Sequence, residues 1–472
     1  MYYSLIAFIA SSAVLIGWTA DAFSHHYVHH HNIDRQRWST LQQPSCVDHS
    51  DQWSSLSSSS ALHAEMNDNE LPSASASSKV PSGENYSTLT LLEHMHLLNT
   101  NVHQQSTTSK DSNSSKRSEM IDFFTNTLGF GMDPKSVDSL LSNKGVVFVN
   151  AGPTQLHLND EVEYCQKLDE LRQQNELNTL SGGNGDKNVF EIGLRYNSLE
   201  ELKTNLLANG SSDDYYSYDI VSLGDGRESI RITDVYDRVF VAREVAESND
   251  DDSCNHEEEP TISSICQQKV ICSNNDYSNK SEEHDEIVKQ YAIPTPQTTC
   301  RGMDFIELFV YVTKEDSEKT VEKIARFYDF FFDATTSVVN DGRSDIAIIA
   351  FGKIDDSGRA EQSMLFRAVV VDERLNHQMV HSEELGTGHH IAIYVGNCDE
   401  DFEVAASNCV DGGLLWVNPQ FEDKVLDVES AMKCKQFRFK NIVDIETGET
   451  LYVLEHEIRS ISHPLFPGAG GN

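Results

Sequence analysis

The stretch Gly-His-His-Ile-Ala-Ile-Tyr-Val, residues 388–395, is the best guide to the fold of this chain. Its near-continuous apolar run with β-branched residues predicts a β-strand. Successive side chains of a strand face opposite ways, so His390, Ala392 and Tyr394 share one face. One of the paired histidines, His389 or His390, is therefore aimed into the fold, where a neutral imidazole is a natural metal ligand. A purely structural histidine at the strand start is the alternative.

The same rhythm of strand, helix and further strands recurs along two ranges, residues 89–245 and 301–461. In the second range, periodicity predicts strands at 305–312, 346–351, 364–371, 390–395, 414–417, 436–442 and 450–457, and helices at 318–332 and 400–408. In the first range it predicts strands at 91–99, 146–150, 155–158, 189–196, 218–222, 229–233 and 239–244, and helices at 119–127 and 199–209. One βαβββ unit therefore occurs four times, which predicts an α+β fold.

Composition limits the partners of the chain. Its 472 residues carry a formal net charge of −39. Binding to phosphate groups needs basic patches, so this charge argues against nucleic acid or an anionic membrane as partner. Nine scattered cysteines without a Cys-x-x-Cys pair argue against a structural zinc site. We expect a small-molecule substrate, and composition leaves the oligomeric state open.

Three segments outside the two ranges have biased composition, and a short tail follows at 462–472. Residues 1–22 have the apolar character of a signal peptide. The Ser- and His-rich residues 23–88 are transit-like and expected to be disordered. Residues 246–300 form an acidic linker. Because residues 20–24, Ala-Asp-Ala-Phe-Ser, resemble the cleavage motif of bipartite plastid presequences, we expect plastid import and no membrane association after processing; secretion is the alternative.

Four short stretches point to a known family by their order and spacing: residues 123–130, 325–328, 390–395, and the turn 444–448 with the strand that follows. They resemble the vicinal oxygen chelate superfamily, which includes glyoxalase I and extradiol dioxygenases. The resemblance implies repeated βαβββ modules, two of which pair per domain around a curved mixed sheet, so that residues 89–245 form one domain and residues 301–461 the other. It also implies ligands on the first and last strands, and a divalent iron, zinc, manganese or nickel ion that holds two vicinal oxygens of the substrate.

In the range 301–461, the resemblance implies a ligand set of Glu307, His390 and Glu455. This would be one histidine with two carboxylates. Tyr452 aligns with the usual glutamate of the last strand, so Glu455 faces the metal only if the register shifts.

In the range 89–245, the resemblance implies a set of His94, His157 and Glu191, with two histidines and one carboxylate. His96 shares the strand face of His94, and the choice between them stays open. Gln155 is an alternative to His157.

The favoured hypothesis is a tandem glyoxalase-like or dioxygenase-like protein, a metal-dependent lyase, isomerase or dioxygenase acting on a small dicarbonyl, hydroxyketone or aromatic diol. The metal would act as a Lewis acid with open coordination positions. The alternatives are a binding protein of the same fold that holds a small ligand without metal, and a scaffold that contacts partners through its acidic linker. The sequence assigns no catalytic residue beyond the ligands.

The targeting hypothesis is tested by fusing residues 1–50 to a fluorescent reporter. We expect import into the plastid, because the fused segment carries both the apolar run and the motif after it. A reporter that is secreted or stays outside the plastid contradicts the prediction.

Overall fold

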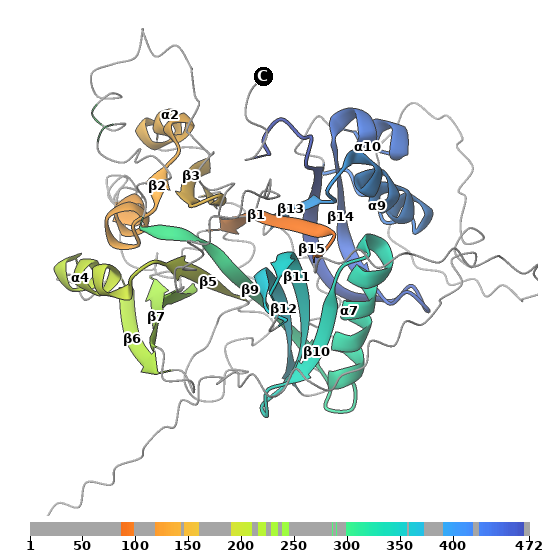
Figure 1. Ribbon diagram of the computed structural model, residues 1–472, viewed down its shortest axis with the longest axis horizontal. Coiled ribbons are helices and arrows are strands. Elements are labelled where there is room, and N and C mark those ends of the chain that lie inside the picture. Colours follow the sequence, from red (N-terminus) through yellow and green to blue (C-terminus); the bar gives the residue numbers. More distant parts are fainter. Residues whose placement is uncertain are drawn as a thin grey trace, which may run out of the picture. The chain divides into compact units, whose positions relative to one another are not determined.

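Two mixed β-sheets make up the part of the protein that the structure, a computed structural model, describes (Figure 1). The described residues are 86–98, 119–142, 146–159, 190–209, 216–222, 228–234, 238–244, 286, 289, 299–355, 358–371, 390–418 and 424–466. All of them fall in one compact unit of the chain. The expected leader, nearly all of the transit-like segment, most of the acidic linker and the end of the tail lie outside the described residues.

The first sheet has seven strands. Their order is β14 (Gln436–Val443), β15 (Thr450–Ser460), β13 (His390–Val395), β1 (Leu89–Leu98), β4 (Thr154–Asn159), β3 (Val146–Ala151) and β2 (Gly131–Met132). The central strands β1 and β13 run antiparallel, and each has a parallel neighbour on its other side, β4 and β15.

The second sheet has eight strands in the same kind of arrangement. Their order is β10 (Thr336–Asn340), β11 (Asp345–Ile354), β12 (Ala360–Val370), β9 (Cys300–Val312), β5 (Phe190–Tyr196), β8 (Val239–Glu244), β7 (Glu228–Asp234) and β6 (Tyr216–Ser222). Here β9 and β5 form the central antiparallel pair, flanked by the parallel neighbours β12 and β8.

Both sheets combine strands that lie far apart in the sequence. In Figure 1 the orange β1 runs beside the blue β13. The strands of residues 89–159 therefore join those of 390–460, and the strands of 190–244 join those of 300–370. The repeated βαβββ modules and the α+β class are confirmed, but modules pair first with fourth and second with third. Neither sheet is built from one of the ranges 89–245 and 301–461 alone.

Helices cover the sheets. They are the π-helical turn η3 (Phe123–Thr127), the 3-10 turn η4 (Pro134–Ser136), α2 (Val137–Leu141), α4 (Leu199–Asn209), α7 (Ser317–Phe332), α9 (Asp399–Asp411) and α10 (Val428–Cys434). The segments β2, η4, α2, β10 and α10 were not predicted from the sequence. The strand predicted at 414–417 is wrong, because the chain leaves α9 through a turn and only Leu415 forms an isolated bridge, to Phe439.

Helix α7 shows how the core joins the two sheets. Its apolar residues at helical spacing are buried, as the periodicity predicts. The Phe327 ring packs on Phe439 of the first sheet, at 5.7 Å between centroids, and the Tyr328 ring packs on Phe366 of the second, at 5.8 Å. Each such burial stabilises the fold by about 1.5–3 kcal/mol.

A second link between the sheets is one buried amide. The Gln362 side chain of β12 is fully buried and donates from Nε2 to the carbonyls of Leu92 (3.2 Å) and Met303 (3.1 Å). Its Oε1 accepts from the Leu92 amide at 3.0 Å. Leu92 and Met303 each flank a register irregularity, in β1 and in β9. Because bulges disrupt the ladder locally, Gln362 satisfies backbone groups that regular pairing would serve.

We expect Gln362→Met, which keeps the length of the side chain, to lower the free energy of unfolding by about 2–4 kcal/mol. The physical reason is that buried backbone groups lose their partners, at about 1–3 kcal/mol each. Urea denaturation of both proteins measures the difference. An unchanged unfolding free energy would show that the bulges do not depend on this amide.

Candidate metal centre

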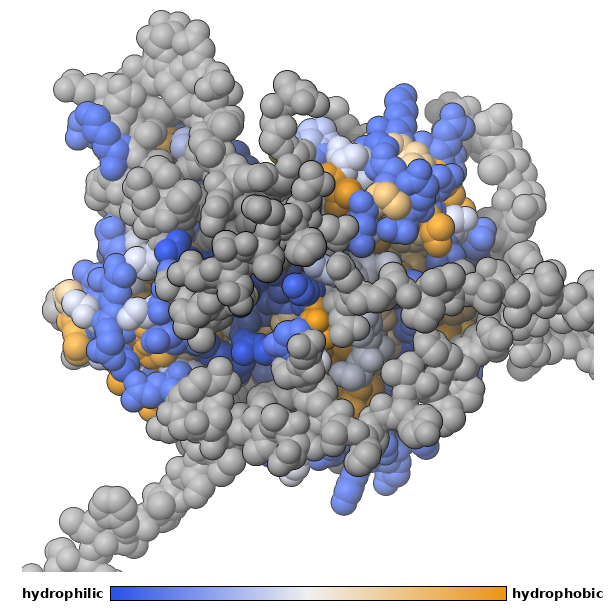
Figure 2. All heavy atoms as spheres, viewed as in Figure 1, coloured by the Kyte–Doolittle hydropathy of each residue, from blue (hydrophilic) through white to orange (hydrophobic). Residues whose placement is uncertain are grey.

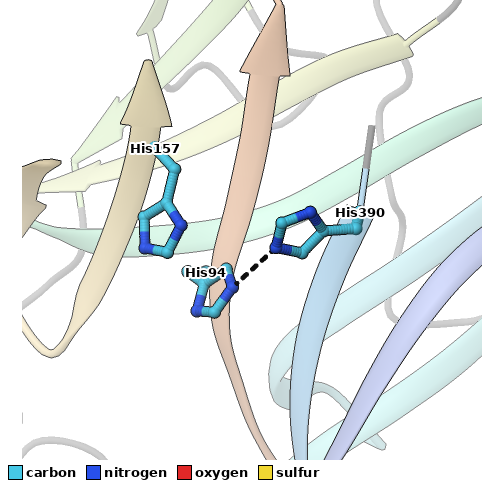
Figure 3. A group of neighbouring side chains, drawn as sticks. All are labelled: His94, His157 and His390. Carbon is cyan, nitrogen blue, oxygen red and sulfur yellow. Dashed lines mark hydrogen bonds between the residues drawn. The ribbon is translucent and has the colours of Figure 1, made fainter. Parts of the chain in front are cut away.

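Three imidazoles from three neighbouring strands converge on one face of the first sheet (Figure 3). They are His94 of β1, His157 of β4 and His390 of β13, called here the histidine triad. One nitrogen from each ring lies within 4.8 Å of the other two. The Nε2 atoms of His94 and His390 are 3.2 Å apart. Two nitrogens that ligate one ion at about 2.1 Å are about 3.0–3.4 Å apart for octahedral to tetrahedral angles, so this spacing fits a shared metal.

The orientation of His157 follows from its polar neighbours. The Gln155 amide nitrogen donates to Asn150 Oδ1 at 2.6 Å, so the amide oxygen faces His157 Nε2 at 2.8 Å. His157 Nε2 therefore carries the proton, and Nδ1 keeps its lone pair. The ring also stacks on His94, with 3.9 Å between the centroids. Gln155, which the sequence offered as an alternative ligand, instead orients His157.

Burial keeps the triad neutral. It lowers the pKa of His94, and it lowers the pKa values of His157 and His390 well below the ordinary range. Neighbouring imidazoles lower two of these pKa values further: His94, His390 and His96 act on His157, and His94 and His96 act on His390. A neutral imidazole is the form that binds metal, so these rings can serve as ligands at neutral pH.

His96 belongs to the same cluster but makes a different contact. Its Nδ1 lies 3.1 Å from Nδ1 of His390, whereas His94 faces Nε2 of the same ring. His390 therefore has an imidazole at each nitrogen. Between the two candidates on β1, the structure groups His94 with the possible metal ligands.

Glu455 lies beside the triad. It is the direct partner of His390 in the parallel pair β13–β15, so both side chains leave the same face of the sheet. The Glu455 carboxylate accepts from Asn418 Nδ2 at 3.0 Å and from Arg438 Nη1 at 2.9 Å. Burial raises the pKa of Glu455, and these two donors oppose that shift. Tyr452, which the alignment favoured, packs against Phe366 instead.

The remaining candidates, Glu191 and Glu307, lie on the second sheet. They are direct partners in the antiparallel pair β5–β9. Glu191 accepts two hydrogen bonds from Arg231, at 2.8 and 2.6 Å. Glu307 accepts from Arg367 at 2.5 Å, and burial raises the pKa of Glu307 against the effect of that arginine. Both carboxylates are thus committed to ion pairs with arginine.

The ligand sets inferred from the two sequence ranges need one correction. His390 joins His94 and His157, and Glu191 joins Glu307. The physical reason is the module pairing, since β13 lies beside β1 and β5 lies beside β9. Sequence periodicity could identify each strand and face, but no local signal specified which strands would be neighbours.

The positions of the second sheet that correspond to the triad carry other side chains. In the first sheet, the register irregularity of β1 comes just before His94, which pairs with Ala392 of β13. In the second sheet, the irregularity of β9 comes just before Phe305, which pairs with Gly193 of β5. When the two sheets are matched strand by strand, Phe305 corresponds to His94, Leu365 to His157 and Glu191 to His390. Phe305 packs with Val239, Val241 and Leu365 in an apolar cluster. At these described positions, two apolar side chains and a glutamate paired with Arg231 stand where the first sheet has three imidazoles.

On the face shown in Figure 2, hydrophilic side chains predominate and apolar residues are scattered. Within the described ranges, no helix combines the length and apolar character needed to cross a bilayer.

Strand order and pairing define the class of fold. Two sheets, each with an antiparallel central pair and each made of two βαβββ modules, give the protein a vicinal oxygen chelate fold with tandem modules. Its structure is similar to that of glyoxalase I from Zea mays, with 9% identity, a TM-score of 0.38, and coverage of 79% of this chain and 93% of that one. A putative dioxygenase from Bacillus subtilis has 12% identity, a TM-score of 0.38, and coverage of 81% and 87%.

Shorter relatives match about one third of the chain. A glyoxalase/bleomycin resistance protein/dioxygenase superfamily member from Sphaerobacter thermophilus has 17% identity and a TM-score of 0.19, and the match covers 34% of this chain and 99% of that one. No family model and no curated protein matches the sequence.

The buried triad predicts acid lability of the metal-free protein. Its lowered pKa values mean that the unfolded chain takes up protons below about pH 6.5 while the folded triad does not, so stability falls as pH falls through that range. Each such imidazole contributes a slope of about 1.4 kcal/mol per pH unit. We expect His157→Asn to reduce the slope of the unfolding free energy against pH by the contribution of about one imidazole. Urea denaturation at several pH values between 7 and 5 measures this slope. An identical slope in both proteins would contradict this.

Proposed function

We propose that the histidine triad binds one divalent metal ion and that the bound ion chelates two adjacent oxygens of a small substrate. The observation that carries this proposal is the convergence of three neutral imidazoles within 4.8 Å, of which His94 and His390 are buried and His157 is partly buried. Three protein ligands are the number that catalytic metal sites use while they leave positions open for substrate.

The donor set narrows the choice of metal. Imidazole nitrogen suits zinc, iron and nickel, whereas manganese prefers carboxylate and carbonyl oxygen. With three imidazoles and one nearby carboxylate, Glu455, we favour zinc, nickel or ferrous iron over manganese.

The metal would supply Lewis acidity to the substrate oxygens. The residues of the chain would do the rest. The triad would hold the ion, and with it the substrate oxygens, at the middle of the sheet, where β1 lies between β4 and β13. Glu455 is the carboxylate on the same face as His390, and burial raises its pKa, which makes it a stronger base. Arg438 and Asn418 keep that carboxylate in place. This assigns to Glu455 the role of general base in a lyase, isomerase or dioxygenase reaction.

Metal binding is tested with Co²⁺ and Zn²⁺ added to the metal-free, full-length protein. We expect one ion per chain in the wild type and at least a 100-fold weaker affinity in His390→Ala, because a ligand is lost. Glu307→Gln is the matched control: it alters a candidate ligand on the second sheet and should leave the affinity unchanged. Isothermal titration and the Co²⁺ absorption spectrum give the readout.

The outcomes separate the hypotheses. Failure of the wild-type protein to bind either ion would contradict the metal-dependent function and favour a metal-free ligand-binding protein. Binding that survives His390→Ala but is lost in Glu307→Gln would place the site on the second sheet.

A further inference from the structure

Glu93 lies where regular strand geometry would not put it. Neighbouring residues of a strand point to opposite faces, so Glu93 and His94 should not meet. The register of β1 against β13 shifts between Leu92 and His94, which leaves Glu93 as an extra residue at that point. Such bulges re-aim side chains and occur near active sites. Here the bulge brings the Glu93 carboxylate onto the side of His94.

The contacts of Glu93 are specific. Its Oε2 lies 3.2 Å from Nδ1 of His94, and the same oxygen accepts from Arg459 Nη1 at 2.5 Å. Glu93 is 5% exposed and His94 is 2% exposed, so this pair is shielded from water. A carboxylate accepts and cannot donate, so His94 Nδ1 must carry the proton.

We propose that Glu93 is a positioning residue of the metal site, a role that rests on the proposed function. By holding the proton on Nδ1, Glu93 leaves the lone pair of His94 on Nε2, the atom that faces His390 Nε2 at 3.2 Å. A carboxylate behind a ligating imidazole fixes its tautomer and ring orientation and raises its basicity.

The charge of Glu93 is held by a buried chain of alternating charges. Arg459 contacts Glu457 through Nη2 and donates from Nε to Glu457 Oε1 at 2.6 Å. Glu457 is also paired with Arg438 at 2.5 Å, and Arg438 pairs with Glu455. Each carboxylate of this chain faces a guanidinium, and these ion pairs offset the cost of burying Glu93 at 5% exposure. The chain links Glu93 to the carboxylate beside His390.

The second sheet supplies a matched comparison. Asp304 is the extra residue at the corresponding irregularity of β9, but the residue after it is Phe305 instead of a histidine. Asp304 lies 3.6–3.7 Å from Arg195, Arg243 and Arg359. The bulged acid and an arginine therefore recur in both sheets, and only in the first does the acid meet an imidazole.

Metal affinity gives the first test. With Co²⁺ as probe, Glu93→Ala should bind about 10–100-fold more weakly than wild type. Glu93→Gln should lose less Co²⁺ affinity than Glu93→Ala, because the amide oxygen can still accept a hydrogen bond from His94 Nδ1. Asp304→Asn, the matched control, should bind as wild type. Equal affinity in wild type, Glu93→Ala and Glu93→Gln would overturn the proposal, and so would an equal loss in Asp304→Asn.

The tautomer of His94 gives a second test that mere destabilisation would not mimic. Nitrogen-15 NMR of the metal-free protein should show His94 protonated on Nδ1 in wild type and Glu93→Gln, and shifted toward the Nε2 tautomer in Glu93→Ala. A wild-type His94 protonated on Nε2 would overturn the inference even if metal binds. If wild type bound no Co²⁺, the proposed function would fail, while the NMR result would still decide whether Glu93 sets the tautomer.

Discussion

The antiparallel pairing of β1 with β13 is the constraint on which the rest of the site depends. It joins residues almost 300 positions apart, and the contact between His94 and His390 spans 296 positions. Bringing the ends of so long a loop together costs conformational entropy, but this cost grows only slowly with loop length. The contacts between the paired strands can therefore offset it. On the face opposite the site, β1 and β13 are buried, and the paired residues Met95 and Ile391 are fully buried. This burial fixes the register of the two strands, because a shift by one residue would expose these apolar side chains. A slip by one residue would turn His390 away from His94.

The second central pair, β5 with β9, shows the same frame used with other side chains. Its flanking strands and bulge match those of the first sheet, yet Phe305 and Leu365 fill the positions of two histidines. Gly193 makes room for that ring, since a Cβ there would lie 2.2 Å from it. Apolar packing and glutamate–arginine pairs thus stabilise a sheet whose described residues do not provide the triad. In this tandem architecture the first sheet carries the histidine triad, and the second has apolar side chains at two of the three corresponding positions.

Much of the fold could be predicted because its signals are local. The spacing of apolar residues in α7 and the near-continuous apolar run of β13 each depend on a window of a few residues. The missed segments have weak local signals: β10 is short and no residue in it is fully buried, and α10 spans only seven residues. The predicted strand at 414–417 failed because the turn after α9 leaves only a single bridge.

The sequence by itself determined the four modules, the strand faces and the individual candidates, among them His94, His157 and His390. Only the tertiary structure decided that these three meet, because side-chain period and turn chemistry are local whereas the choice of neighbouring module is not. It also decided the roles of Glu93 and Gln155, which depend on a bulge and on a hydrogen-bond network that period-two geometry does not encode. A strand pattern specifies which way a residue points, and the sheet order specifies what it points at.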